Sequence, residues 1–177
     1  RKPIPCIQLL HCLENEVKGG FSTLVDGFSV SEYLRKNHKD LFKILTKTKV
    51  RFRFVDKTII LENWGELIEL DDNNKIKQVR YSTRLDYVPA LEKKELEIFY
   101  EARKLISDLY ASSKFEIKFR LEKGDLLMMD NHRLLHGRTS YDVSEGKRYL
   151  KGCYIDHDST EGKLRYLERK FGLKWKK

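Results

Sequence analysis

The sequence predicts an α+β fold, a β-sandwich or jelly roll with helices packed on its outside. Many short β-rich runs are separated by turn signals, and helical periodicity is confined to segments that do not alternate regularly with strands. The chain has 177 residues and no internal repeat, which suits one hydrophobic core. We therefore expect a single domain over 1–177. Because the first residues already have a strand pattern, we expect this domain to be incomplete at its N-terminus.

The first two predicted strands span 5–14 and 21–27. Both are rich in aliphatic residues, and the segment "NEVKGG" between them carries the glycines of a turn. We expect the two strands to form a hairpin.

Two segments have the periodicity of amphipathic helices. In 31–47 the residues at helical spacing are Leu34, His38, Leu41 and Leu45. In 93–113 one face carries Leu96, Phe99, Ala102, Ile106 and Leu109. Both helices should pack an apolar face against the sheets.

The remaining segments are mostly β-rich. Four short runs between 50 and 82 indicate a meander or an insertion between the two helices. Further strands are expected in 115–131, 133–139 and 148–156, and a short basic helix should end the chain. This arrangement of many strands with segregated helices is the basis of the predicted fold class.

Composition narrows the function classes. The formal net charge of +9 comes mostly from scattered lysines, which indicates a solvated surface rather than a specific nucleic-acid site. The three cysteines have no paired metal-binding spacing, so buried free thiols in a reducing, cytoplasmic compartment are expected. No apolar stretch approaches the roughly 20 residues of a membrane span, and the start lacks a signal-peptide pattern.

The candidate chemistry lies in the last two predicted strands. Strand alternation places His136 and Arg138 on one face of the first of them. The same rule gives the last strand one face with Arg148, Leu150, Gly152 and Tyr154. If these strands are neighbours, the two faces could line one cavity.

These residues lie in segments that resemble a known family. The segment "GDLLMMDNHRLLHGRTSYD", then "RYLKGCYIDHD", is similar to the C-terminal half of the gamma-butyrobetaine and trimethyllysine dioxygenases, which belong to the taurine-dioxygenase-like oxygenases. Upstream, "IQLLHCLENEVKGGFSTLVDGF" resembles the same family in the same order. The resemblance implies a double-stranded β-helix, Fe(II) and 2-oxoglutarate, and hydroxylation of a small molecule such as a trimethylammonium compound. Relatives that dimerise make a homodimer plausible.

The resemblance also implies roles for individual residues. His136 matches the distal iron ligand, and Arg148 matches the arginine that grips the far carboxylate of 2-oxoglutarate. Ser22 falls where the family has a hydroxyl near that carboxylate, and Arg138 could help hold the cosubstrate or pair with an acidic neighbour. Tyr154 matches an aromatic residue that faces the trimethylammonium group, although an ordinary core tyrosine is equally consistent.

The family's H-x-D pair of iron ligands is missing. The one formal H-x-D, His38 to Asp40, lies in a predicted helix, where residues two apart point in different directions and cannot chelate. Since one imidazole cannot hold Fe(II) for turnover, we expect this chain to be part of a longer enzyme or an inactive fragment. The alternatives are a noncatalytic β-sandwich that binds a partner or dimerises through its basic C-terminal helix, and nucleic-acid binding through charge alone.

Other polar residues favour structural roles. His132 stands where relatives commonly have tryptophan, so a packing or hydrogen-bonding substitute is favoured over a new metal ligand. For His157, capping or solvent exposure is favoured over metal binding, and His11 is interpreted as structural. We expect Arg133 to pair with an acidic neighbour such as Asp130.

Overall fold

Two three-stranded antiparallel sheets form the body of the protein. The computed structural model describes residues 4–172. Sheet A has the order β11-β1-β9, with β1 at Ile7–Asn15, β9 at Leu126–Asp130 and β11 at Arg148–Ile155. Sheet B has the order β10-β2-β8, with β2 at Ser22–Asp26, β8 at Glu116–Phe119 and β10 at Leu134–Arg138.

The first two strands lie in different sheets, so the predicted hairpin is wrong. The connection between β1 and β2 crosses from sheet A to sheet B and passes close to the segment that follows β10. The Gly20 N–H donates to the Ser140 carbonyl at 3.1 Å, and a Cβ at Gly19 would lie 2.5 Å from the same carbonyl oxygen. The glycines therefore permit a close approach between two chain segments rather than a tight hairpin turn.

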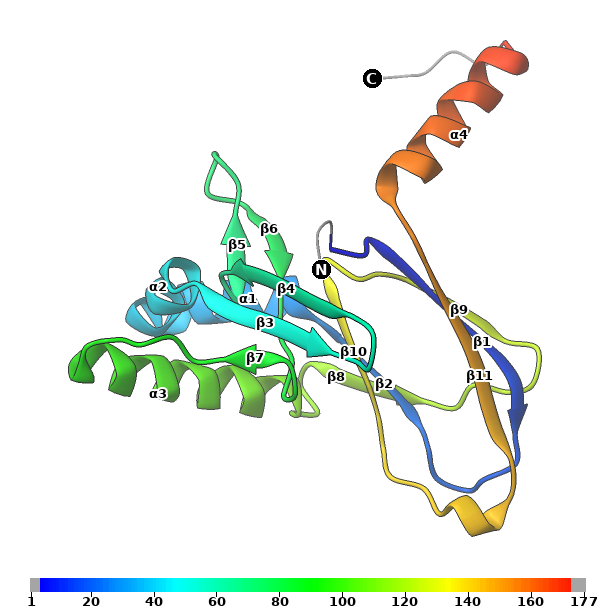
Figure 1. Ribbon diagram of the computed structural model, residues 1–177, viewed down its shortest axis with the longest axis horizontal. Helices are drawn as coiled ribbons and strands as arrows, with labels where there is room; N and C mark the ends of the chain where they lie inside the picture. Colours follow the sequence, from blue (N-terminus) through cyan, green and yellow to red (C-terminus); the bar gives the residue numbers. More distant parts are fainter. Residues whose placement is uncertain (1–3, 173–177) are drawn as a thin grey trace.

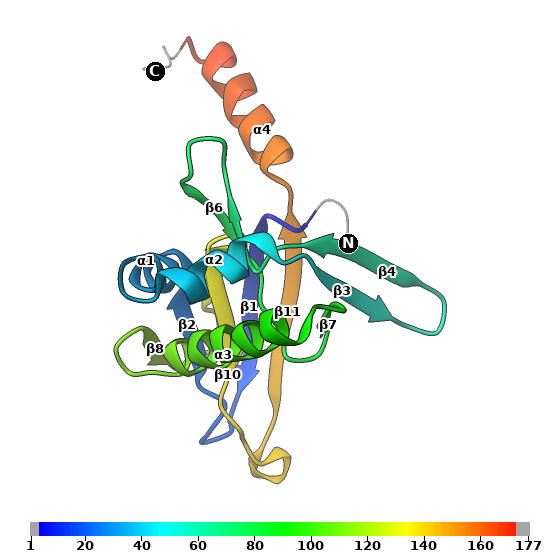
Figure 2. The same ribbon diagram turned by 90° about the vertical axis from the view of Figure 1, so that its left-hand side faces the viewer.

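Three helices cover the face of sheet B that points away from sheet A (Figures 1 and 2). They are α1 (Gly27–Asn37), α2 (Lys39–Lys47) and α3 (Lys93–Tyr110). The main hydrophobic core includes Val25 of β2, Leu34 of α1, Leu45 of α2 and both Phe99 and Ile106 of α3. Sheet B thus lies between a helical layer and sheet A (Figure 1).

The helix predicted over 31–47 is divided in two. It begins earlier than expected because Asp26 caps α1 and accepts a hydrogen bond from the Phe28 N–H at 3.0 Å. The break falls at His38, whose backbone (φ −140°, ψ 63°) leaves the helical region. The hydrophobic spacing continues across this break, which explains why the sequence pattern alone predicts one helix.

The β-rich runs between 50 and 82 form an insertion of two separate sheets. One sheet has the order β4-β3-β7, with β3 at Val50–Val55, β4 at Ile60–Gly65 and β7 at Asp86–Tyr87. The other is a hairpin of β5 (Ile68–Leu70) and β6 (Ile76–Val79). The Val79 N–H donates to the His132 carbonyl at 2.9 Å and so joins this insertion to the turn that precedes β10.

The last helix, α4 (His157–Lys170), follows β11 and projects from the body (Figure 1). None of the residues of α4 is buried. A short 3-10 helix at Val143–Glu145 precedes β11. The helices of residues 4–172 include none with the length and apolar content that crossing a bilayer requires.

The α3 face that packs into the core should dominate the stability of the helical layer. Ile106 is fully buried, whereas Ile98 of the same helix is 40% exposed. We expect Ile106→Ala to lower the free energy of unfolding by about 2 to 5 kcal/mol, because it removes buried methyl groups and leaves a cavity. Ile98→Ala should cost about 1 kcal/mol or less. Urea denaturation of both variants measures the difference, and equal losses would contradict the assigned packing.

Candidate functional site

The space between the two sheets is lined by one face of each. In sheet A, Gln8 lies opposite both Tyr154 and Met129, and Cys12 lies opposite Leu150. Gln8, Cys12 and Met129 are all buried, so this face points towards sheet B. Because alternate residues of a strand share a face, Arg148 and Tyr154 point to the same side as Leu150.

In sheet B the register separates a helix-facing side from a side facing sheet A. Val25 belongs to the core under the helices, and its partner across the strands is Leu135. The alternate positions therefore face sheet A, and they include Ser22 opposite Arg138 and His136 opposite Leu24. Ser22, His136 and Arg138 thus share one face, as strand alternation predicts for the last two.

The condition that the last two strands are neighbours is not met, because β10 and β11 lie in different sheets. β10 pairs with β2, and β11 pairs with β1, so His136 and Arg148 approach the same space from opposite sheets. The reason is that strands consecutive in this part of the sequence alternate between sheets A and B. Local patterns specify the face of a strand but not the sheet to which it belongs.

The Arg148 guanidinium lies in a positively charged and partly dehydrated environment. Its Nη2 donates to the Gly20 carbonyl at 3.2 Å, while its buried Nε has no hydrogen-bond partner among residues 4–172. Burial lowers the pKa of Arg148, and the positive charge of Arg138 lowers it further. No ion pair within the described chain includes Arg148, so its charge lacks an acidic partner there.

Tyr141 lies beside both arginines. The guanidinium carbon of Arg138 is 4.4 Å from the centre of the Tyr141 ring, and that of Arg148 is 5.4 Å from it. Arg138 takes part in no ion pair within the described residues, and Asp142 instead accepts hydrogen bonds from Ser144. Arg148 is partly buried and Arg138 is exposed, so the two guanidinium groups together offer a positively charged, partly dehydrated site that fits a carboxylate ligand.

His136 lies on the wall of a cavity of about 550 Å³ between sheet B and the insertion. Other wall residues include Asn63, Gln78 and Asn131. The residue is exposed to solvent through this cavity, yet the surrounding protein dehydrates the ring and lowers the pKa of His136. A lowered pKa favours the neutral imidazole at pH 7, which is the form that binds a metal.

Three further residues singled out from the sequence, Tyr154, Arg133 and His11, lie in different environments. Tyr154 is 50% exposed on the inner face of sheet A. Arg133 forms an ion pair, as expected, but with Asp26 rather than Asp130, and its Nε and Nη2 lie 3.0 and 2.6 Å from the two carboxylate oxygens. His11 lies on the outer face of sheet A, opposite Lys151, which suits a structural role.

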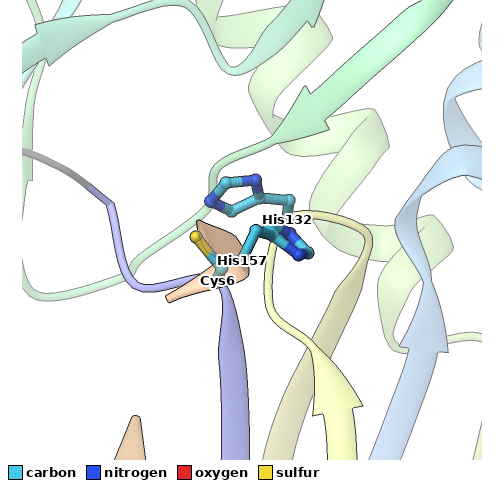
Figure 3. A group of neighbouring side chains, drawn as sticks. All are labelled: Cys6, His132 and His157. Atoms are coloured by element: carbon cyan, nitrogen blue, oxygen red, sulfur yellow. The ribbon is translucent and has the colours of Figure 1, made fainter. Parts of the chain in front are cut away.

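The described residues supply only one of the expected iron ligands. Within residues 4–172, no group of three or more histidine, cysteine or acidic side chains at metal-binding distances includes His136. The one such group in that range consists of Cys6, His132 and His157, whose side chains converge in Figure 3. Sequence reasoning missed this group, because its members come from three distant segments in none of the usual metal-binding spacings.

The comparisons with known proteins agree with the predicted resemblance. Gamma-butyrobetaine dioxygenase from Homo sapiens is 35% identical over 94% of this chain and 44% of its own length. The enzyme of the same name from a Pseudomonas species is 32% identical over 93% of this chain, and mitochondrial trimethyllysine dioxygenase from Gallus gallus is 29% identical over 92%. The chain spans less than half the length of these relatives, 44%, 43% and 40% respectively.

Solved structures show the same fold at low identity. The crystal structure of AAD-2 with Mn(II) and N-oxalylglycine has a TM-score of 0.68 at 16% identity, covering 87% of this chain and 64% of that one. An asparagine oxygenase with Fe(II), hydroxyasparagine and succinate has a TM-score of 0.63 at 16% identity, covering 88% and 46%. The family model for the taurine catabolism dioxygenase TauD, TfdA family matches residues 1–154, and the chain therefore belongs to that family.

Proposed function

We propose that the protein containing this chain is an Fe(II)- and 2-oxoglutarate-dependent dioxygenase. The observation that carries this proposal is Arg148, a partly dehydrated guanidinium on the inner face of sheet A with an unsatisfied Nε and no acidic partner among the described residues. A guanidinium binds a carboxylate through two parallel hydrogen bonds, which suits the far carboxylate of 2-oxoglutarate. The cosubstrate would supply the negative charge that the site lacks.

Two neighbours support the same ligand. Ser22 is buried on the inner face of sheet B, where its hydroxyl could donate to a carboxylate oxygen. Arg138 lies directly opposite Ser22 and adds a second positive charge near Arg148. Together these side chains would orient a dicarboxylate and hold it away from bulk water.

We further propose that the two sheets are part of a double-stranded β-helix, or jelly roll. Strands β8, β9, β10 and β11 alternate between sheets B and A, as the winding of such a fold requires. This winding brings β10 and β11 to opposite sides of one interior. An iron ligand on β10 and a cosubstrate anchor on β11 can then serve the same site.

His136 would hold the iron together with ligands from outside the described residues. Its neutral imidazole can donate a lone pair to Fe(II), and non-haem oxygenases of this kind use two histidines and one carboxylate. When bound, iron and 2-oxoglutarate supply an oxidative decarboxylation to succinate that is coupled to hydroxylation of a C–H bond. The described chain contributes the cosubstrate anchor and one metal ligand.

The proposed substrate is a small trimethylammonium compound, with gamma-butyrobetaine first and trimethyllysine second. The gamma-butyrobetaine dioxygenases of Homo sapiens and of a Pseudomonas species are 35% and 32% identical to this chain, and the trimethyllysine dioxygenases of Meyerozyma guilliermondii and Gallus gallus are 32% and 29% identical. Tyr154 offers an accessible aromatic ring on the inner face of sheet A. An aromatic face attracts a quaternary ammonium group by about 0.5 to 2 kcal/mol.

The role of Arg148 can be measured by 2-oxoglutarate binding. We expect Arg148→Ala to weaken binding by roughly 10- to 100-fold, since hydrogen bonds to charged groups contribute about 1.5 to 3 kcal/mol. Arg148→Lys should retain part of the affinity, because it keeps the charge but not the two-pronged geometry. Isothermal titration calorimetry of the full-length protein provides the measurement. Arg165→Ala, a charge deletion on α4, is the matched control, and equal affinities of Arg148→Ala and Arg165→Ala would refute the assignment.

A glycine substitution tests the same site without changing Arg148 itself. A Cβ at Gly20 would lie 2.8 Å from Arg148 Nε, whereas a Cβ at Gly124 would meet no atom within 4 Å. Both glycines have a positive φ, so Gly20→Ala and Gly124→Ala introduce similar backbone strain. We expect only Gly20→Ala to weaken 2-oxoglutarate binding. A loss of the same size in both variants would show that strain, not displacement of the guanidinium, is responsible.

Substrate recognition by Tyr154 predicts a pattern in steady-state kinetics. With gamma-butyrobetaine, Tyr154→Ala should raise KM by roughly 2- to 30-fold, whereas Tyr154→Phe keeps the aromatic face and should change KM little. Succinate formation by the full-length protein gives the rates. If Tyr154→Phe and Tyr154→Ala behave alike, the ring does not contact the cation. If the wild-type protein neither forms succinate nor binds 2-oxoglutarate, the noncatalytic β-sandwich is the better description.

A further inference from the structure

We propose that Cys6, His132 and His157 form a second metal site, specific for a zinc-class divalent ion and separate from the proposed iron centre. Their candidate ligand atoms, the Cys6 sulfur and one ring nitrogen of each histidine, all lie within 4.8 Å of one another. Figure 3 shows the three side chains pointing towards one another. This inference does not depend on the proposed dioxygenase activity.

The register of sheet A brings the three segments together. Ile7, at the start of the central strand β1, lies opposite Asp130 at the end of β9 and opposite Ile155 at the end of β11. Cys6 immediately precedes this point, and His132 and His157 each follow their strands by two residues. Three segments that are distant in sequence therefore meet at one end of the sheet.

Backbone hydrogen bonds fix two of the three segments. The Asn131 N–H donates to the Cys6 carbonyl at 2.7 Å, and the Asn131 side chain donates to the Pro5 carbonyl at 3.0 Å. On the other side, the His132 carbonyl accepts from the Val79 N–H at 2.9 Å. The main chain of Cys6 and His132 is thus held in place, which lowers the conformational entropy lost when a metal binds.

The hydrogen bonds of the Cys6 and His132 side chains are long, so a metal ion could replace them. The Cys6 thiol lies 3.5 Å from the Ile4 carbonyl, and Nε2 of His132 lies 3.4 Å from the same oxygen. The rings of His132 and His157 meet at an angle of 72° with their centres 5.5 Å apart. If Nε2 of His132 donates to Ile4, Nδ1 carries the lone pair, and a backbone carbonyl of this kind commonly orients a metal-bound histidine.

One thiolate and two imidazoles favour zinc over hard cations. Zn(II) takes sulfur at about 2.3 Å and histidine nitrogen at about 2.0 to 2.1 Å, which puts tetrahedral ligand atoms roughly 3.3 to 3.7 Å apart. The candidate ligand atoms now lie within 4.8 Å of one another, so the distances between them would need to shorten by about 1 Å when the metal binds. Three protein ligands leave one tetrahedral position for water or another small donor, whereas magnesium and calcium prefer oxygen ligands.

The site would attach α4 to the sheets. Cys6 is 8% exposed and belongs to the body, while His157 is the first residue of α4, in which no residue is buried. Because α4 gains little from hydrophobic burial, a metal bond at its first turn would fix where the helix leaves sheet A. The expected role is structural.

Cobalt provides the most direct test, because Co(II) replaces Zn(II) and a bound thiolate gives it a charge-transfer absorption in the near ultraviolet. Metal-free full-length protein is titrated with Co(II), and Zn(II) affinity is measured by competition with a chelator. The wild-type protein should show this band at one equivalent, and Zn(II) should abolish it. His157→Ala and Cys6→Ser should weaken Zn(II) binding at this site at least tenfold, and Cys6→Ser should lose the thiolate band.

Matched controls separate this site from other ligands. His11→Ala and Cys153→Ser remove a histidine and a cysteine elsewhere in sheet A, and His136→Ala removes the proposed iron ligand; all three should keep the band. His157→Ala is the decisive variant, since His157 lies in a helix without buried residues and circular dichroism should show an intact fold. A wild-type protein without the thiolate band, or a band that persists in Cys6→Ser, would overturn the proposal.

Discussion

The arrangement of the site depends on one dehydrated positive charge between two sheets. Arg148 is held against the Gly20 carbonyl, its pKa is lowered by burial and by Arg138, and no carboxylate among the described residues neutralises it. Leaving the buried Nε of a partly dehydrated guanidinium without an acceptor costs free energy unless a ligand supplies one. The inner faces of sheets A and B provide the space in which an anion can do so.

The other candidate groups lie on the inner face of sheet B. Ser22 and Arg138 lie opposite each other on sheet B, and His136 lies two residues from Arg138 on the same face. Because a strand alternates its side chains, this spacing puts the proposed metal ligand and the proposed anion-binding arginine on one face of β10. Only one of the proposed iron ligands, His136, lies in the described residues, and the chain spans 44% of the length of the human relative, so the proposed activity is that of the protein containing this chain.

The sequence predicts the elements better than their pairing. Hydrophobic periodicity locates α3 and most strands, and the family resemblance gives the correct family. The predicted hairpin between the first two strands and the predicted uninterrupted helix through His38 are wrong. The sequence also leaves open whether β10 and β11 are neighbours, because strand pairing depends on contacts between distant segments. The convergence of Cys6, His132 and His157 depends on the same long-range register, so each residue considered alone favours a structural role.

A crystal structure of the full-length protein with N-oxalylglycine, the molecule bound with Mn(II) in the AAD-2 structure, would show whether Arg148 anchors the cosubstrate. We expect one carboxylate of the ligand to form two hydrogen bonds with Arg148 between sheets A and B. The rest of the ligand should extend towards the side of sheet B that carries His136. A ligand bound elsewhere, with the Arg148 guanidinium still facing only the Gly20 carbonyl, would contradict this role of Arg148.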